Sequence, residues 1–372
     1  MALHSTRRSF LRNVATVSAA LPALHLSARS KRLDEEVDWY NVEDWGIEGK
    51  GWTDTLRYYD RFPSKAEGSV REAVWNLSRQ SAGMNAHFSS DSPSIHVRYS
   101  LFSDRIAMPH MPATGVSGVD LYARDDQGNF RWLAVSRPEE QEVEAEIAKE
   151  LAPGMREYRA YLPLYNGIES LEIGVAKGST FSEVSPREQR PIVFYGTSIM
   201  HGACASRPGM AFPSILGRRL DLPIINLAFS GNGRMEPEVG ALLAELDPIA
   251  FAIDCLPNMN GELVSERAGP LVQQIKAAHP DTPVLLVEDR TNTNTPFFPQ
   301  RRDHHTRNRL ALRKTFQQLQ DKGLDDLYYL QGEHLLGLDG EGATDGSHPS
   351  DLGMMRYADA YEPALRGMLG RF

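Results

Sequence analysis

Four short segments of this chain carry side chains suited to acyl-transfer chemistry. Ser198 directly follows an apolar run, and Gly196 and Gly202 on either side of it permit a tight turn that would present the hydroxyl. Asp345 stands three residues before His348 in a stretch rich in glycine and serine. A carboxylate at that spacing can hold the imidazole through Nδ1 and leave Nε2 free as a general base. The residue types predict a Ser-His-Asp triad.

Two further segments offer donors for an oxyanion. Gly231 follows the second apolar run and Asn258 follows the third, and a backbone N–H and a side-chain amide can stabilise a tetrahedral oxygen together with the N–H of Ser198. Gly233 lies two residues further on, so the choice between the two glycines stays open. Each segment alone is also typical of an ordinary turn or helix N-cap. Their occurrence at successive predicted strand ends favours catalysis.

The elements that would position these residues form an α/β domain. Apolar runs are typical of buried parallel strands, and they occur at 192–195, 224–229, 249–253, 284–287 and 327–330. Helical patterns lie between and after them, around 209–220, 235–246, 262–279, 303–322 and beyond Ser350. Ligands of such sheets bind at the carboxyl ends of the strands. The candidate residues follow these ends.

The first half of the chain has a different period. From about residue 70 to residue 176 apolar and polar residues alternate, as in Ile95 to Leu101, and such alternation is typical of half-buried strands. We therefore expect an antiparallel β-sandwich domain over 35–176. Residues 177–191 are polar and contain two prolines, which predicts a linker before the second domain, 192–372.

The N-terminus has the composition of an export signal. Arg7 and Arg8 precede Phe-Leu-Arg, an apolar stretch runs from Val14 to Leu26, and small residues end at Ala28. This resembles a twin-arginine signal over residues 1–28, and the alternative is a basic amphipathic helix. We expect an exported protein that works in the periplasm or outside the cell. No other stretch is apolar and long enough to enter a membrane.

Charge and cysteine content exclude several classes of protein. The 372 residues include 40 Lys and Arg and 49 Asp and Glu, a net charge of −9, and cleavage after Ala28 would remove three arginines and no acid. This acidity argues against nucleic acid as a partner and favours a neutral ester over a polyanion. Cys204 and Cys255 are too few for a disulfide framework. They could pair with each other or remain thiols, and the oligomeric state is open.

Three histidines outside the candidate triad are each open to two interpretations. Asp303, His304 and His305 are adjacent, but neighbouring residues on a helix point to different sides and no spaced third ligand follows. We therefore predict a helix N-terminus with solvated histidines and no metal site. His201 lies near Ser198 in the sequence and could line the pocket or belong to the turn.

Three methionines and the end of the fourth strand are also ambiguous. Met200, Met235 and Met259 could form an apolar wall for an acyl group or pack in helices and turns. Glu288 and Arg290 could order the pocket or form a structural ion pair.

The order of these motifs resembles the SGNH hydrolase superfamily, also called GDSL-type esterases. The resemblance covers roughly 191–372 and implies a flavodoxin-like three-layer α/β/α domain, while the upstream sandwich resembles a domain that accompanies one bacterial branch. Carried over by position, Ser198 matches the nucleophile, His348 the base and Asp345 its orienting acid. Gly231 and Asn258 match the oxyanion donors.

The resemblance also implies a reaction. Such enzymes hydrolyse acyl esters without a metal or organic cofactor, and this branch suggests removal of acetyl groups from small-molecule or carbohydrate substrates. Thr197 stands where the common motif has Asp, and residues 254–258 replace the usual Gly-x-Asn-Asp, so the acyl chain and the alcohol stay open. The alternatives are a carbohydrate-binding protein with an inactive hydrolase domain, and a lipase or thioesterase of the same fold.

Overall fold

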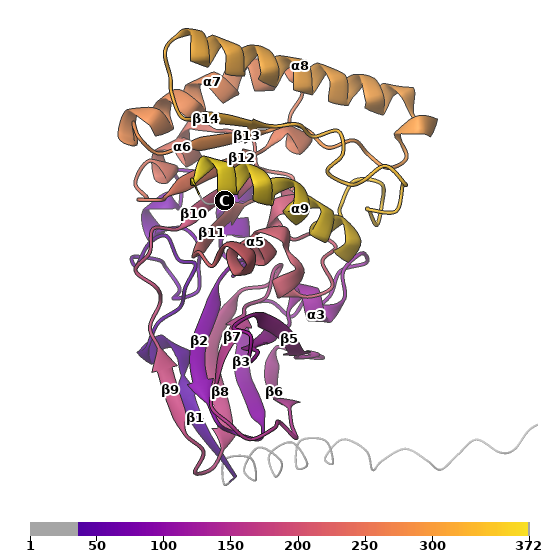
Figure 1. The fold of residues 1–372 in the computed structure, drawn as a ribbon. Coiled ribbons are helices and arrows are strands. Elements are labelled where there is room, and N and C mark those ends of the chain that lie inside the picture. Colours follow the sequence, from indigo (N-terminus) through magenta and orange to yellow (C-terminus); the bar gives the residue numbers. More distant parts are fainter. Residues whose placement is uncertain (1–35, 371–372) are drawn as a thin grey trace, which may run out of the picture.

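The computed structural model describes residues 36–370, which form a β-sandwich followed by a three-layer α/β domain (Figure 1). The proposed export signal, including Arg7, Arg8 and the cleavage point after Ala28, lies outside the described residues. Within 36–370 no helix has the length and apolarity needed to cross a bilayer.

The N-terminal half contains two antiparallel sheets. The first has the order β1 (Val37–Asn41), β8 (Ile168–Ala176), β3 (Ile95–Leu101) and β6 (Glu142–Ala148). The second has the order β5 (Phe130–Val135), β4 (Asp120–Arg124), β7 (Arg156–Tyr161), β2 (Asn85–Ser90) and β9 (Phe181–Val184). Side chains from both sheets, such as Val97 and Tyr158, are buried in one cluster, so the predicted sandwich is confirmed.

Part of the predicted linker is a strand. Residues Phe181–Val184 form β9, which pairs antiparallel with β2. The apolar side chain that directs this pairing is Phe181, whose ring stacks on Tyr40 at 3.9 Å between centroids and lies 5.5 Å from the ring of Phe88. The irregular connection between the domains is therefore confined to 185–191.

The C-terminal half is built on a five-stranded parallel sheet within the described chain. Its order is β11 (Ile224–Ala228), β10 (Ile192–Gly196), β12 (Ala250–Asp254), β13 (Val284–Val287) and β14 (Leu327–Leu330). All five predicted strands are present, and this 2-1-3-4-5 order is the flavodoxin-like one.

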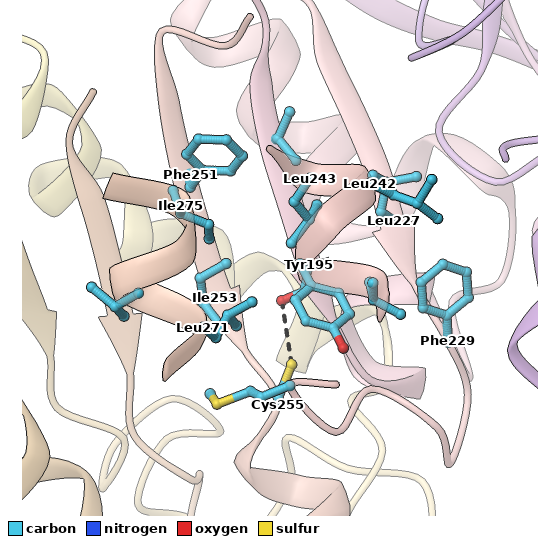
Figure 2. Packing of buried hydrophobic residues seen from close by; sticks show 14 of the residues in the cluster. Tyr195, Leu227, Phe229, Leu242, Leu243, Phe251, Ile253, Cys255, Leu271 and Ile275 are labelled. Atoms are coloured by element: carbon cyan, nitrogen blue, oxygen red, sulfur yellow. Dashed lines mark hydrogen bonds between the residues drawn. The ribbon is translucent and has the colours of Figure 1, made fainter. Parts of the chain in front are cut away.

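Helices cover both faces of this sheet. The described α-helices are α2 (Glu72–Ser78), α3 (Ala113–Val116), α4 (Ser198–His201), α5 (Phe212–Leu220), α6 (Pro237–Leu243), α7 (Gly261–Ala278), α8 (Pro299–Asp321) and α9 (Asp351–Met368). Helices α6, α7 and α8 bury their apolar sides on one face, and α4, α5 and α9 do so on the other. Figure 2 shows part of the first layer, with Tyr195, Phe251 and Cys255 among its side chains.

The N-terminal half also contributes to the core of the α/β domain. Phe62, Val70, Val74 and Trp75 are buried in the same cluster as the α6–α8 layer, and the last two lie on α2. The sequence predicts strands from about residue 70 and assigns this segment to the sandwich. The strand expectation is wrong here, because residues 72–78 form a short helix whose apolar side packs on the neighbouring domain.

The register of the parallel strands explains where the candidate residues meet. Gly196 at the end of β10 lies opposite Ala228 at the end of β11 and Asp254 at the end of β12. The three strands therefore end at one level. Ser198, Gly231 and Asn258 follow within two to four residues of these ends, so the backbone must place them at one edge.

Candidate active site

Ser198 begins the single-turn helix α4 immediately after β10. The turn is tight because Gly202 closes the helix in the left-handed region, at φ 110°, where other residues are strained. The side chain of Ser198 is 6% exposed, and its Oγ lies 2.8 Å from Nε2 of His348. The first and last segments of the α/β domain therefore meet at this hydroxyl.

The loop before α9 holds the imidazole through its other nitrogen. Nδ1 of His348 lies 2.7 Å from Oδ2 of Asp345, so Nδ1 carries the proton and Nε2 faces Ser198 as an acceptor. Oδ1 of Asp345 accepts the backbone N–H groups of Ser347 and His348. Burial raises the pKa of Asp345, but these hydrogen bonds and the imidazole outweigh it and lower the pKa to about 2. The carboxylate therefore stays ionised.

The two glycines after β11 differ in what their N–H groups do. The N–H of Gly233 donates to the carbonyl of Phe229 at 3.0 Å and to Oδ1 of Asn258 at 3.2 Å. Gly231 has a φ of 70°, and its N–H makes no hydrogen bond to the described residues. Because Asn258 accepts through Oδ1, its Nδ2 remains a donor. Gly231 and Asn258 are thus the groups available for an oxyanion.

Gly233 is needed for the close packing of two loops. A Cβ at this position would lie 2.0 Å from the carbonyl oxygen of Gly196, closer than any side chain can approach. Glycine here lets the loop after β11 pack against the loop that carries Ser198.

Side chains from the N-terminal half support this loop. The hydroxyl of Tyr165 donates to the carbonyl of Ser198 at 3.4 Å, and its ring stacks on His201 at 4.3 Å. Nε2 of His201 donates to the carbonyl of Leu164 at 2.6 Å. His201 is fully buried and burial lowers its pKa, so it is a neutral packing residue and does not line the site.

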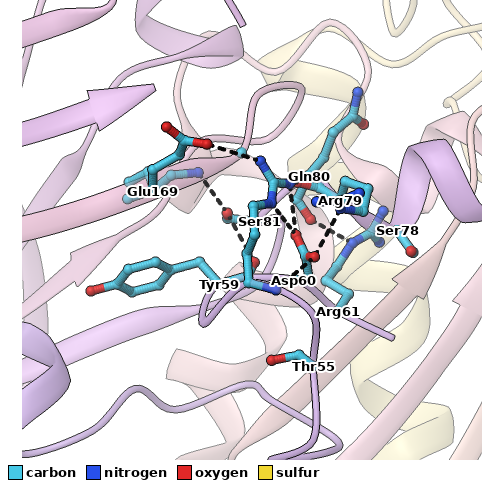
Figure 3. Close-up of polar contacts among 12 residues, drawn as sticks. Thr55, Tyr59, Asp60, Arg61, Ser78, Arg79, Gln80, Ser81 and Glu169 are labelled. Carbon is cyan, nitrogen blue, oxygen red and sulfur yellow. Dashed lines mark hydrogen bonds and ion pairs between the residues drawn. The ribbon is translucent and has the colours of Figure 1, made fainter. Parts of the chain in front are cut away.

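Arg61 fixes the end of β11 in a similar way. Its guanidinium donates to the carbonyls of Asn226 and Ala228 at 2.9 and 2.8 Å, and to those of Leu77 and Gln80. The side chain is buried, which lowers its pKa to about 9. Figure 3 shows Arg61 in this segment, next to the ion pair between Asp60 and Arg79. Sequence reasoning missed these contacts, because nothing local marks an arginine that serves another domain.

His110 is a second residue that sequence reasoning missed. It lies in the exposed loop between Met108 and Met111 of the N-terminal half, and its ring centroid is 6.4 Å from that of His348. An exposed histidine between two strands of another domain carries no signal in the sequence.

The end of β13 forms a buried ionic network. Asp289 pairs with Arg290 and accepts a 2.7 Å hydrogen bond from Nδ1 of His305, while Arg290 also donates to Oγ of Ser347. The prediction of solvated histidines is therefore wrong for His305, which is 3% exposed, because the turn after β13 places a carboxylate against α8. Glu288 forms an ion pair with Arg313.

The remaining candidates separate in space. Met200 packs on one face of the sheet, whereas Met235 and Met259 pack on the other, so the three do not form one apolar wall. Cys204 and Cys255 are both buried free thiols. Among residues 36–370 no group of three or more His, Cys, Asp or Glu side chains is placed to hold a metal ion.

Comparison with known proteins gives two family matches that divide the chain. Residues 189–366 match the GDSL-like lipase/acylhydrolase family. Residues 37–181 match the N-terminus of SGNH hydrolase-type esterases. No curated protein matches the chain.

Solved structures agree with this division. A structure described as a GDSL-like lipase from Bacteroides ovatus is 32% identical with a TM-score of 0.86, over 90% of this chain and 98% of that one. Two others share the fold at lower identity. A salicylyl-acyltransferase from a tetracycline biosynthetic pathway is 18% identical with a TM-score of 0.71, over 89% and 97% of the chains. A family two carbohydrate esterase from Cellvibrio japonicus is 12% identical with a TM-score of 0.59, over 90% and 98%.

Proposed function

We propose that this chain, which belongs to the GDSL-like lipase/acylhydrolase family and is therefore a serine ester hydrolase, removes acetyl groups from carbohydrates through Ser198, His348 and Asp345. The observation that carries the proposal is the continuous relay from Ser198 Oγ to His348 Nε2 at 2.8 Å and from His348 Nδ1 to Asp345 Oδ2 at 2.7 Å. Nucleophile, base and orienting acid stand in the order that acyl transfer requires.

The first half of the reaction forms an acyl-enzyme. His348 Nε2 takes the proton from Ser198 Oγ as that oxygen attacks the ester carbonyl. Charge on the tetrahedral oxygen is stabilised by the N–H groups of Ser198 and Gly231 and by Nδ2 of Asn258, each worth about 3 kcal/mol of the barrier. The C–O bond to the alcohol then breaks, and the imidazolium returns its proton to the leaving oxygen.

The second half releases the acid. Water donates a proton to His348 Nε2 and attacks the acyl carbon, and the second tetrahedral intermediate uses the same donors. Its collapse returns the proton to Ser198 Oγ. Asp345 holds the imidazolium in place in both halves, and the hydrogen bonds that keep its pKa near 2 keep it charged.

We propose that the alcohol part of the ester is a carbohydrate and that the acyl part is acetyl. The shared fold with a family two carbohydrate esterase supports a sugar ester, and the N-terminal residue His110 beside His348 supports a binding surface that extends across both halves of the chain. The leader sequence supports export through the twin-arginine route to the periplasm or beyond.

The experiment is a comparison of wild type and Ser198→Ala on 4-nitrophenyl acetate and on acetylated methyl glycosides. We expect Ser198→Ala to lower turnover by several orders of magnitude, and we expect wild type to prefer acetyl over longer acyl chains. Unchanged turnover in Ser198→Ala would overturn the proposed nucleophile. A clear preference for long chains would overturn the deacetylase and favour a lipase.

A further inference from the structure

A basic cavity of about 300 Å³ lies at the carboxyl edge of the parallel sheet, beside the proposed active site. Its volume is at the lower end of the range for small-molecule sites, about 300–1,000 Å³, which is enough for one sugar-sized unit. Apart from a proline, all its lining side chains are polar or basic: Arg290, Asn292, Gln300, Arg301, His304 and His305.

The cavity is close to the candidate catalytic residues, because two residues adjacent to them in the sequence line it or contact its lining. Pro257 lines the cavity and directly precedes the oxyanion donor Asn258. Arg290 donates to the hydroxyl of Ser347, which directly precedes His348. A substrate held at Ser198 would therefore reach this cavity with an adjoining part of its structure.

The charge of the lining is positive. No carboxylate lines the cavity. The nearest acid in the hydrogen-bond network is Asp289, which lies behind it and is already engaged by Arg290 and by Nδ1 of His305. Arg309 also joins this network, because its Nε donates to the backbone carbonyl of Asp289. The charge of Arg290 is therefore compensated by Asp289. The guanidinium of Arg301 has no carboxylate partner among the described residues.

Two buried polar atoms of the cavity have no partner in the described chain. Nε of Arg290 makes no hydrogen bond although the residue is only 6% exposed, and Oδ1 of Asn292 makes none at 9% exposure. Such orphaned groups are rare because each costs free energy. The first is a charged donor and the second an acceptor, and both belong to side chains that line the cavity.

His304 supplies a further donor. Nδ2 of Asn308 donates to the carbonyl of Met259 at 3.0 Å and lies 3.1 Å from Nε2 of His304, so that ring nitrogen accepts. Burial lowers the pKa of His304, and the neutral ring then carries its proton on Nδ1. Gln300 and Arg301 also lie in the first turn of α8, where the helix dipole favours an anion.

We propose that this cavity is a substrate subsite for a single carboxylate, so that the preferred substrates are acyl esters that carry one carboxylate near the ester bond. The inference rests on the proposed ester hydrolysis and names its substrate class. The carboxylate is bound by the guanidinium groups of Arg290 and Arg301 and by the imidazole of His304, and a neighbouring hydroxyl lies against Asn292. The carboxylate belongs either to the sugar or to the acyl group, as in a succinyl ester.

Two matched pairs of substrates distinguish these sources. The first pair is an acetylated methyl glucuronoside and its methyl ester, and the second is a succinylated methyl glucoside and its methyl ester. We expect wild type to favour the free acid at least tenfold in kcat/KM in one pair, and that pair identifies the side that carries the carboxylate. The preference should fall as salt is raised.

The variants assign the preference to the cavity. Arg301→Gln should reduce the tenfold ratio to about two or less. Arg302→Gln is the matched control, because Arg302 is exposed one residue further on and does not line the cavity, and its ratio should equal that of wild type.

Each outcome decides one question. Ratios near one in both pairs, from a wild type that hydrolyses the neutral esters, would overturn the subsite and leave the proposed function intact. A preference that survives in Arg301→Gln would overturn its assignment to this cavity. A wild type that hydrolyses none of the four esters or 4-nitrophenyl acetate would instead overturn the proposed function.

Discussion

Asp254 at the end of β12 should make the protein less stable as the pH rises towards neutrality. Its side chain is 1% exposed, and Oδ2 accepts a 2.7 Å hydrogen bond from the hydroxyl of Tyr361. Burial, with a smaller contribution from Asp289, raises its pKa from 3.8 to about 7, while Tyr361 and Arg290 act in the opposite direction. The folded chain therefore keeps this proton well above the pH at which the unfolded chain releases it.

The magnitude follows from that shift. Below about pH 4 the carboxyl is protonated in both states and costs nothing. Between about pH 4 and pH 7 only the unfolded state ionises, so the free energy of unfolding falls by about 1.4 kcal/mol per pH unit. Above pH 7 the loss levels off at about 4 kcal/mol, the equivalent of a pKa rise from 3.8 to about 7.

The assay is urea unfolding of wild type and Asp254→Asn at several pH values from 4 to 8. Asparagine still accepts from Tyr361 through its oxygen, and any penalty for its buried NH₂ is the same at every pH. The difference in unfolding free energy between variant and wild type should therefore move in favour of the variant by about 4 kcal/mol from pH 4 to pH 8. A movement below about 1 kcal/mol would mean that folding does not raise the pKa of Asp254.

Other variants test the candidate site and the leader. Asn258→Ala should lower kcat on acetyl esters by about 10²–10³-fold with little change in KM, measured by steady-state kinetics, and an unchanged kcat would remove Asn258 from the oxyanion hole. Because hydrogen bonds keep the pKa of Asp345 near 2, Asp345 should contribute no proton to the acid side of the kcat/KM profile, and an acid side with a slope of two protons between pH 4 and pH 6 would contradict this. Arg7→Lys together with Arg8→Lys should retain the chain in the cytoplasm on cell fractionation, whereas normal export would exclude the twin-arginine route.

Local pattern was sufficient for the strands of the α/β domain. Residues 192–195 and 284–287 were predictable because parallel strands covered on both faces are continuous apolar runs. The candidate relay was also accessible, since the types of Ser198, His348 and Asp345 limit the chemistry and the strand ends limit their place. Strand β9 could not be predicted, because a four-residue edge strand with one half-buried ring looks like a polar linker.

Contacts between segments that are distant in the chain could not be predicted from the sequence. The helix α2 and Arg61 serve the neighbouring domain, and no local feature shows which surface a short amphipathic segment will cover. His305 was expected in solvent at a helix N-terminus, because nothing in the sequence shows that its partner, Asp289, follows β13 and lies against this helix. The proposal of Gly231 rather than Gly233 as an oxyanion donor likewise needed the hydrogen bond from Gly233 to Asn258, which depends on how two loops meet.

In the proposed reaction, His348 activates Ser198 for attack on an acyl carbon. Its most direct test is labelling of the folded protein with a fluorophosphonate probe, followed by peptide mass spectrometry. We expect one label per chain on Ser198, formed more slowly in the presence of excess acetyl ester substrate and reduced strongly in His348→Ala. An active esterase that carries no label on Ser198, or a label on another residue, would contradict it.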